Sequence, residues 1–564
     1  MEKLNARNPN SFPLTPLGFL DRAATVYGDC PSIIYNTTTY TWSQTHRRCL
    51  QLASSLVSII GIKRGHVVSV LSPNVPAMYE LHFAVPMAGA ILSNLNTRLD
   101  ARTISILLRH SESKLLFVDV LSKSLALEAI SLFPLNIKPP VLVLITDDEV
   151  AAADDEMSLS PTVEFIDTYE GLMIKGDHNF KWVMPDSEWD PIVLNYTSGT
   201  TSSPKGVLHC HRGFFIITVD ALIDWSVPKQ PVFLWTLPMF HSNGWSYPWG
   251  MAAVGGVNVC LRRFDAAVIY RLILKHKVTH MCGAPVVLNM LANFQLPDDQ
   301  ALGNHRIRFL TGGAPPPATI LYRMEELGFV VSHGYGLTEA GGIVISCAWK
   351  SKWNRLPATE RARLKARQGV GTLAMSGIDV VNPATGESVK RDGVAQGEIV
   401  LRGPCVMLGY FKDPESTSKC MTNDGWFYTG DVAVMHADGY LEIKDRSKDV
   451  IISGGENLSS VEVESVLYTN PVVNEAAVVA KPDEYWGETP CAFVSLKRSN
   501  NGGGGGGDLS AVAMEKEIIE YCRARLPHYM VPKTVVVKDE LPKTSTGKIQ
   551  KSVLREMAKV ISRM

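Results

Sequence analysis

One stretch indicates the fold of this chain: Tyr196-Thr-Ser-Gly-Thr-Thr-Ser-Ser-Pro-Lys-Gly206. It follows a strand-like apolar run at 191–195 and precedes an apolar helical pattern. A turn so rich in Gly, Ser and Thr exposes backbone N–H groups and hydroxyls that can bind polyphosphate, and Lys205 adds a positive charge. The spacing is not that of a Walker A loop. Taken alone, the stretch is compatible with two interpretations: a phosphate-binding site or an ordinary Ser/Thr-rich turn.

Helical and strand-like segments alternate on both sides of this loop. Helical patterns cover 45–60 and 77–89, and strand-like runs cover 66–71, 114–118, 140–145, 191–196, 232–237 and 257–261. Such alternation predicts an α/β fold with buried, largely parallel sheets. The clearest change of pattern comes near 444–449, after which a unit of about 115 residues follows. That length is typical of a domain.

The composition is that of a small-molecule enzyme. The chain has 564 residues, with 55 Lys and Arg against 56 Asp and Glu, so its net charge is −1. No overall field attracts it to nucleic acid or to an anionic membrane. The longest apolar stretch, 83–92, is shorter than the roughly 20 residues that span a bilayer. We therefore expect no nucleic-acid partner and no integral membrane segment.

Seven further motifs follow the loop along the chain. They are Pro238-Met-Phe-His-Ser-Asn-Gly-Trp245, Gly312-Gly-Ala-Pro-Pro316, His333-Gly-Tyr-Gly-Leu-Thr-Glu339, Gly397-Glu-Ile-Val-Leu-Arg-Gly403, Gly425-Trp-Phe-Tyr-Thr-Gly-Asp431, Asp445-Arg-Ser-Lys-Asp449 and Pro542-Lys-Thr-Ser-Thr-Gly-Lys548. In this order they resemble the motifs of the AMP-forming adenylate enzymes, which include acyl-CoA synthetases, 4-coumarate–CoA ligase, luciferase and nonribosomal adenylation domains. The chain as a whole is similar to plant peroxisomal-type acyl-activating enzymes.

The resemblance implies a two-part architecture. It predicts a large N-terminal domain, 1–445, of stacked mixed α/β sheets with a small barrel-like subdomain. A small mobile α+β C-terminal domain, 446–564, would follow, with a hinge near 446–449 centred on Lys448. Family members rotate the C-terminal domain between two half-reactions, so Lys448 is expected to absorb the backbone change.

The resemblance also implies ATP, Mg²⁺ and coenzyme A as reactants or cofactors, and it assigns residues to each. The implied catalytic residues are Lys548, His241, Thr338 and Glu339, with Glu339 as the Mg²⁺ ligand. The implied nucleotide-binding residues are Thr197, Ser198, Gly199, Thr200, Thr201, Ser202, Lys205, Gly313, Ala314, Gly334, Tyr335, Gly336, Asp431 and Arg446. Ser202 stands where the family usually has Gly.

Coenzyme A and the acyl group would occupy neighbouring positions. The resemblance implies Arg263, Gly454, Gly455 and Arg525 as CoA-binding residues. Ile452 stands where some relatives have a CoA-contacting Lys, which puts one contact in doubt. The chain continues only about sixteen residues past Lys548, so we expect free CoA rather than a downstream carrier domain as the acceptor.

The acyl pocket is expected near Trp245, Gly341 and Gly342. If Trp245 points inward, its bulk favours a short- or branched-chain aliphatic monocarboxylic acid, with a benzoate- or cinnamate-type acid as the alternative. A luciferase-like oxidative enzyme and a catalytically inactive binding protein are the alternatives from other classes.

The last three residues, Ser562-Arg563-Met564, resemble a Ser-Lys-Leu peroxisomal address. We expect peroxisomal localisation through an import receptor, with the cytosol as the alternative.

Overall fold

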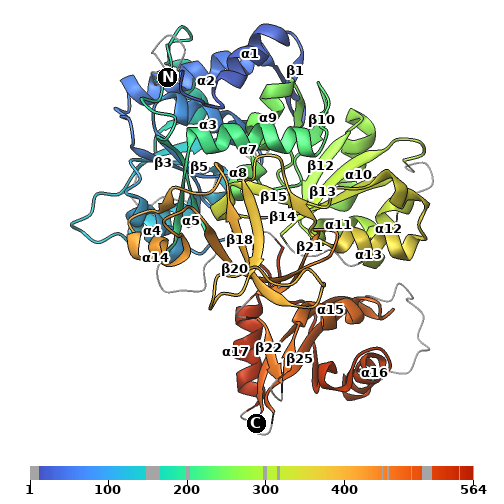
Figure 1. The fold of residues 1–564 in the computed structure, drawn as a ribbon. Coiled ribbons are helices and arrows are strands. Elements are labelled where there is room, and N and C mark those ends of the chain that lie inside the picture. The colour runs from blue at the N-terminus through green and yellow to red at the C-terminus, as the bar shows by residue number, and fades with distance from the viewer. Residues whose placement is uncertain are drawn as a thin grey trace, which may run out of the picture.

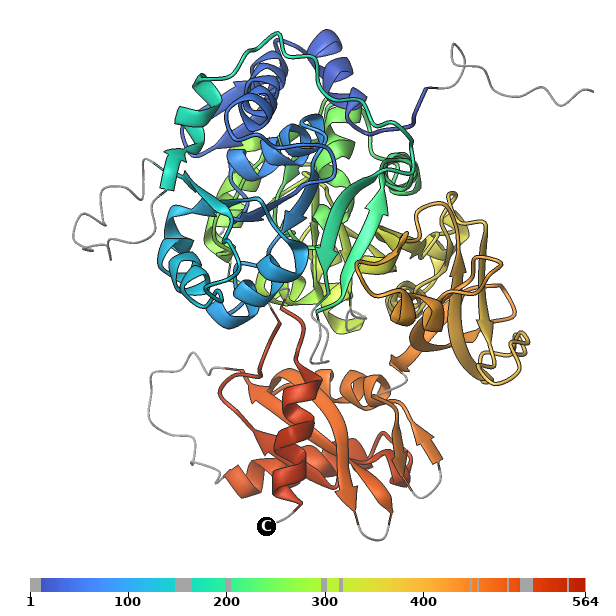
Figure 2. The ribbon, with the colours of Figure 1, turned by 90° about the vertical axis from the view of Figure 1, so that its left-hand side faces the viewer.

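The computed structural model describes residues 12–147, 165–197, 204–295, 302–313, 318–446, 449–453, 456–483, 486–497, 511–544 and 547–562. Two large sheets and a smaller one form the upper part of the molecule in Figure 1, and the last part of the chain lies below them. The view in Figure 2 separates the three: the blue-to-green sheets, the yellow-orange sheet beside them and the orange-to-red C-terminal part underneath.

The first large sheet has eight strands. Its strand order is β19 (Gly409–Tyr410), β9 (Gly206–Cys210), β8 (Pro191–Tyr196), β4 (Ile91–Asn94), β3 (Val67–Leu71), β5 (Leu115–Asp119), β6 (Val141–Ile145) and β7 (Phe165–Thr168). The five pairings from β8 to the edge strand β7 are parallel, and the two pairings at the β19 end are antiparallel. All residues of β3 and β5 are buried. Strands covered on both faces read as continuous apolar runs.

The second large sheet has nine strands and is parallel in its centre. Its strand order is β16 (Val370–Gly371), β15 (Gly342–Ser346), β14 (Phe329–Leu337), β13 (Ile307–Gly312), β12 (His280–Gly283), β10 (Val232–Leu234), β11 (Val257–Val259), β1 (Pro31–Tyr35) and β2 (Thr38–Thr41). Ligands in such sheets bind beyond the carboxyl ends of the strands. The predicted motifs begin at those ends, since Gly313 follows β13 and Thr338 follows β14.

Helices pack between and around the two sheets (Figure 1). They are α1 (Gly18–Val26), α2 (Trp42–Ser58), α3 (Pro76–Met87), α4 (Ala101–Ser111), α5 (Lys123–Ser131), α6 (Tyr169–Ile174), α7 (His211–Asp224), α8 (Ser242–Trp245), α9 (Tyr247–Val254), α10 (Ala266–His276), α11 (Pro285–Asn293), α12 (Ala318–Glu326) and α13 (Ala358–Ala366). Helix α2 begins with a capping box, in which Thr41 and Gln44 exchange side-chain and backbone hydrogen bonds. Every residue of α3 except Pro76 is buried, which places the helix at the centre of the largest core.

The third sheet is antiparallel and has four strands, in the order β17 (Gly377–Val381), β18 (Gln396–Arg402), β20 (Phe427–Met435) and β21 (Leu441–Arg446). Helix α14 (Pro414–Cys420) lies between β19 and β20 in the sequence. This sheet corresponds to the predicted small subdomain.

The C-terminal part has its own sheet and its own core. The strands β23 (Glu456–Leu458), β22 (Ile451–Ser453), β25 (Gly487–Leu496) and β24 (Val473–Asp483) pair in that order, and β26 (Thr534–Val537) pairs with β25. Its helices are α15 (Ser460–Tyr468), α16 (Ala511–Arg523) and α17 (Lys551–Ile561). Sheet membership changes between Arg446 and Ile451, beside the predicted hinge.

The predicted α/β class with largely parallel sheets is confirmed. One predicted strand, 232–237, is shorter than expected, because β10 ends at Leu234. Beyond it the Asn74 side chain donates to the carbonyls of Trp235 and Leu237, 2.9 Å each, in place of a neighbouring strand. Among the described residues, no helix combines the length and apolar character needed to cross a bilayer.

Candidate functional site

The predicted adenosine-binding residues meet between the second and third sheets. Tyr335, on β14, donates a 2.7 Å hydrogen bond from its hydroxyl to the Asp431 carboxylate on β20. Both residues are buried, at 8% and 7% exposure. Asp431 pairs in register with Arg446 on β21; the Arg446 side chain lies outside what the structure describes. The contact joins two motifs about 100 residues apart in the sequence.

Gly334 and Gly336 allow two backbones to approach closely. A Cβ at Gly336 would lie 1.8 Å from the carbonyl oxygen of Gly342, and a Cβ at Gly334 would lie 2.5 Å from Ile343 Cγ2. Strand β15 therefore packs against β14 through a register shift at Tyr335. Gly334 and Gly336 thus fix the position of Tyr335 between them. Their contact with a nucleotide stays a prediction.

The predicted metal and phosphate residues form a second group. The carboxylate of Glu339 accepts a 2.9 Å hydrogen bond from the Tyr410 hydroxyl, and Lys205 Nζ lies 4.9 Å from the Tyr410 ring centroid. Burial, followed by the charge of Glu339, raises the pKa of Tyr410, so its hydroxyl stays protonated and donates. Thr197 N–H donates to the Lys205 carbonyl, 3.1 Å, and closes the neck of the loop.

Two residues of this group were not predicted from the sequence. Besides Tyr410, His209 donates from Nε2 to the Thr338 carbonyl oxygen at 2.7 Å. A carbonyl only accepts, so this nitrogen carries the proton. Burial lowers the pKa of His209 to about 4, which keeps the ring neutral. The His209-Cys210-His211 cluster and the Gly409-Tyr410 pair were visible in the sequence, but no motif marked them as partners of 338–339.

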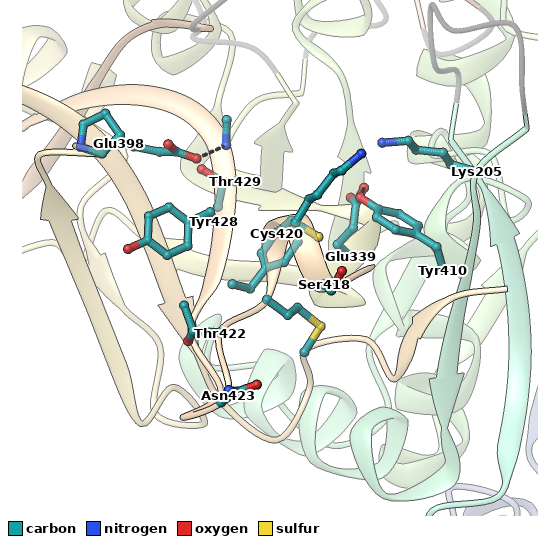
Figure 3. A pocket seen from close by; sticks show the side chains of 15 residues that line it. Lys205, Glu339, Glu398, Tyr410, Ser418, Cys420, Thr422, Asn423, Tyr428 and Thr429 are labelled. Atoms are coloured by element: carbon teal, nitrogen blue, oxygen red, sulfur yellow. Dashed lines mark hydrogen bonds between the residues drawn. The ribbon is translucent and has the colours of Figure 1, made fainter. Parts of the chain in front are cut away.

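A cavity of about 780 Å³ opens beside the second group. In Figure 3, Lys205, Tyr410 and Glu339 lie on one side of it, and Glu398, Tyr428 and Thr429 lie on the other. Gly430 donates its N–H to Glu398 at 2.8 Å, which anchors the turn before Asp431. The cavity thus extends from the acidic and basic groups of the second group to the turn that carries Asp431.

Lys548, in the C-terminal part, lies against Gly313 at the end of β13. A Cβ at Gly313, where φ is +91°, would lie 2.7 Å from Lys548 Cε and 3.2 Å from Nζ. The absence of a side chain at Gly313 therefore leaves room for the lysine. His241 lies nearby: burial and then the Lys548 ammonium lower the pKa of His241 to about 3. His241 is therefore neutral at physiological pH and cannot serve there as a general acid in its cationic form.

Trp245 lies in an unusual backbone segment. Residues 242–246 all have positive φ, from 37° to 68°, and four of the five are not glycine. This conformation costs an L-residue about 1–2 kcal/mol, and such strain is concentrated at functional sites. The turn carries the Trp245 ring inward, so that a Cβ at Gly312 would meet its Cη2 at 3.3 Å.

The predicted acyl-pocket residues are only partly together. Gly342 lies against Trp245, whose carbonyl oxygen would be 3.8 Å from a Cβ at Gly342. A Cβ at Gly341 would instead lie nearest to His209, at 3.5 Å. Asn243 of the same turn is fully buried and accepts a hydrogen bond from Asn195.

The predicted CoA residues occupy different places. Arg263 lines a second cavity of about 290 Å³ together with Arg98, Arg262 and Phe240. Arg262 pairs with Asp119 and Asp147 at 2.7 and 2.5 Å, whereas burial lowers the pKa of Arg98. Arg525 stacks on the Tyr521 ring at 3.7 Å within the C-terminal part and does not line this cavity. Ile452 is 52% exposed.

Several predicted positions lie outside the described residues: Ser198, Gly199, Thr200, Thr201 and Ser202 of the loop, Ala314, the hinge residue Lys448, and Gly454 and Gly455.

Comparison with known proteins identifies the family of the chain. The model of the AMP-binding enzyme family matches residues 20–411, and that of the AMP-binding enzyme C-terminal domain matches 462–548. The chain is 68% identical to 2-methylpropanoate–CoA ligase CCL4 of Humulus lupulus over 99% of this chain and 98% of the relative. It is 64% identical to the probable acyl-activating enzyme 5, peroxisomal, of Arabidopsis thaliana, over 99% and 98%.

Solved structures show the same fold. The anthranilate–CoA ligase AuaEII in complex with anthranoyl-AMP superposes with a TM-score of 0.82 at 22% identity, covering 99% of this chain and 100% of that one. A fatty acyl-CoA synthetase of Mycobacterium tuberculosis superposes with a TM-score of 0.69 at 28% identity, covering 97% and 99%. The chain therefore belongs to the AMP-binding enzyme family and is an AMP-forming acid–thiol ligase.

Proposed function

We propose that this ligase activates a short- or branched-chain aliphatic monocarboxylic acid and transfers it to CoA. The observation that carries the substrate class is the Trp245 ring, which is directed at Gly312, the neighbour of the Gly313 against which Lys548 lies. A narrow apolar pocket favours compact acids over long chains. The name of the relative CCL4, a 2-methylpropanoate–CoA ligase, supports the same class. A benzoate- or cinnamate-type acid is the alternative.

In the proposed first step, a carboxylate oxygen of the acid attacks the α-phosphorus of ATP and the bond to pyrophosphate breaks. Negative charge develops around phosphorus, and the Lys548 ammonium stabilises it. Asp431 accepts hydrogen bonds from the ribose, with Tyr335 holding the carboxylate. In the second step the CoA thiol attacks the acyl carbonyl carbon, and AMP leaves.

Glu339 is the residue proposed to hold Mg²⁺. Its carboxylate supplies the hard oxygen ligand that Mg²⁺ prefers, and the adjoining cavity of about 780 Å³ has room for phosphate oxygens and water as the remaining ligands. When bound there, the ion neutralises charge on the phosphate oxygens. Tyr410 orients the carboxylate through its 2.9 Å hydrogen bond.

Arg263, together with Arg98, is proposed to bind the phosphates of CoA. Both guanidinium groups line the cavity of about 290 Å³ beside Phe240, immediately before His241. Guanidinium groups recognise phosphate through paired hydrogen bonds. Arg525 lies outside this lining, so a contribution from it would require movement of the C-terminal part.

The function is tested by measuring pyrophosphate release with ATP, Mg²⁺ and CoA. The acids compared are acetate, propanoate, 2-methylpropanoate, hexanoate, octanoate, palmitate, benzoate and cinnamate, and each acyl-CoA product is identified by mass. We expect release with the short and branched acids, stimulated by CoA. Preference for benzoate or cinnamate would support the alternative. If no acid gave a product, the result would favour a luciferase-like oxidative enzyme or a catalytically inactive binding protein.

Asp431→Ala should raise the KM for ATP about ten- to a hundredfold. Hydrogen bonds to charged groups contribute about 1.5–3 kcal/mol, and the buried carboxylate is proposed to hold the ribose. Tyr335→Phe removes only the hydroxyl that donates to Asp431 and should raise the KM about fivefold, the effect of about 1 kcal/mol. Steady-state kinetics with varied ATP tests both; an unchanged KM in Asp431→Ala would contradict the assignment.

Trp245→Ala should extend the substrate range toward longer chains. Removing the indole enlarges the space in front of Gly312, and each methylene accommodated is worth about 1–3 kcal/mol. We expect kcat/KM for octanoate relative to 2-methylpropanoate to rise at least about tenfold. Trp189→Ala, at a tryptophan that is 54% exposed, is the matched control and should leave the ratio unchanged. An unaltered ratio in Trp245→Ala would show that the indole does not limit the pocket.

Localisation in the peroxisome is proposed from the C-terminal tripeptide and from the relative named as peroxisomal; the cytosol is the alternative. Ser562 closes α17, and its Oγ donates to the Lys559 carbonyl at 2.8 Å. Arg563 and Met564 lie outside the described residues. A fluorescent fusion with Met564 free, compared with one lacking 562–564, distinguishes the two locations.

A further inference from the structure

A charged network lies inside the C-terminal part, behind the loop that carries Lys548. Lys551, at the start of α17, pairs with Glu464 of α15 at 2.8 Å, and the two side chains are 17% and 16% exposed. Glu464 also accepts the N–H of Val478 at 2.7 Å. Burial opposes the charge on Lys551, but Glu464 and Asp445 outweigh it and raise the pKa of Lys551. The ammonium is therefore a fixed charge.

The network crosses from the C-terminal part to the third sheet. Lys551 Nζ donates to Ser460 Oγ at 2.5 Å, and the same hydroxyl donates to Asp445 Oδ2 at 2.5 Å. The Ser460 N–H donates to this carboxylate oxygen at 2.8 Å. Ser460 and Asp445 are 0% and 3% exposed. Asp445 belongs to β21 and lies before the predicted hinge, whereas Ser460 begins α15 and lies after it.

The other end of the network is the catalytic loop. Lys551 follows Lys548 by three residues, and the loop is closed by Thr544, whose Oγ1 accepts the Lys548 N–H at 3.1 Å. At Gly547, φ is +80° and a Cβ would lie 2.3 Å from Val286 Cγ1 of α11. The loop therefore fits against the N-terminal part only without a side chain there. The two parts of the molecule touch at Asp445 and Ser460, and again at the loop.

We propose that Lys551 is a positioning residue for adenylation: by holding Glu464 and Ser460, it joins the Lys548 loop to Asp445 and favours the arrangement in which Lys548 reaches Gly313. The proposal rests on the proposed two-step function. Rotation about 446–449 would separate Asp445 from Ser460, because the two lie on opposite sides of the hinge. Buried hydrogen bonds to a charged group are strong enough to bias such an equilibrium. The network therefore stabilises the arrangement in which adenylation takes place. It does not act on the transition state of the reaction.

The test separates the two half-reactions in the full-length protein. Adenylation is measured as acid-dependent exchange of labelled pyrophosphate into ATP, and thioester formation as conversion of supplied acyl-AMP and CoA. Ser460→Ala, Asp445→Asn and the double variant Lys551→Met with Glu464→Gln should each lower the exchange about tenfold, since each removes at least one hydrogen bond to a charge. Thioester formation should stay within about twofold of the unchanged protein.

Controls make the result specific. Lys551→Arg keeps a donor to Glu464 and Ser460 and should restore exchange to within about threefold of the unchanged protein. Lys559→Met removes an exposed lysine of the same helix, paired with Glu556 at 2.7 Å, and should change neither half-reaction. Ser460→Ala removes only one hydroxyl oxygen, so this variant should fold even if the double variant does not.

Two results would overturn the proposal. Parallel loss of both half-reactions in Ser460→Ala would indicate a merely structural role, and normal exchange in all three variants would exclude any role. If the unchanged protein catalyses neither half-reaction with any acid, the proposed function fails instead.

Discussion

Lys548→Ala should lower the rate of acyl-AMP formation by about a hundred- to a thousandfold, the usual effect of removing a group that stabilises charge in a transition state. The lysine side chain lies over Gly313, within 2.7 Å of where a Cβ would stand, and its ammonium acts on His241. The charge therefore lies beside Gly313 and close enough to His241 to lower its pKa, where the nucleotide and acyl groups are proposed to meet. Acid-dependent exchange of labelled pyrophosphate into ATP measures this half-reaction directly.

The same variant should retain thioester formation. If the C-terminal part rotates between the half-reactions, Lys548 leaves the site before CoA attacks, so acyl-AMP supplied from outside should still be converted at a rate within a few-fold of normal. Lys543→Ala is the matched control, because Lys543 lies in the same loop but pairs with Glu475 at 2.7 Å. Normal pyrophosphate exchange in Lys548→Ala would refute its catalytic assignment.

Acidification should destabilise the fold sharply between about pH 6 and pH 4. Burial lowers the pKa of His82, His209, His211 and His280 to about 4 each. In the unfolded chain these rings take up protons near pH 6.5. The folded state therefore binds fewer protons in this window, and the stability present above pH 6.5 is lost as the pH falls toward 4. Each ring lowers the free energy of unfolding by at most about 3 kcal/mol at pH 4. The total free energy of unfolding of a protein is typically about 5–15 kcal/mol.

Urea unfolding at several pH values tests this prediction. His280→Gln should weaken the pH dependence, because it removes one buried ring that packs edge-on against Trp225 with ring centroids 5.0 Å apart. The exposed His178, replaced by Gln, should leave the dependence unchanged. A free energy of unfolding that stays constant from pH 7 to pH 4.5 would show that these rings titrate normally.

The alternation of elements could be predicted because it depends on local patterns, and the family could be predicted because its motifs keep their order along the chain. Apolar runs such as 67–71 and 115–119 form strands wherever both faces are covered, and the turn residues around Lys205 and Tyr335 are tied to fixed positions along the chain. The resemblance of eight motifs assigned Tyr335 and Asp431 to the same nucleotide, but it predicted no contact between their side chains. The hydrogen bond from Tyr335 to Asp431 is known only from the structure.

The partners of the motif residues could not be predicted in the same way. Tyr410 and His209 hold Glu339 and Thr338, yet they lie 71 and 129 residues away in the sequence. Gly341 faces His209 and not the Trp245 ring, because its φ of +73° turns the backbone at the end of a 3-10 turn. A pattern of spacing contains no information on which side of a turn a residue faces.

By itself the sequence determined the α/β class, which follows from periodicity, and the family, which follows from the resemblance of its ordered motifs. Only the tertiary structure decided that Trp245 points toward Gly312, that Lys548 lies over Gly313 and that Lys551 connects to Asp445 through Ser460. The physical reason is that each of these contacts depends on how separate sheets and helices pack. Packing is fixed by the shapes and buried charges of residues far apart in the chain.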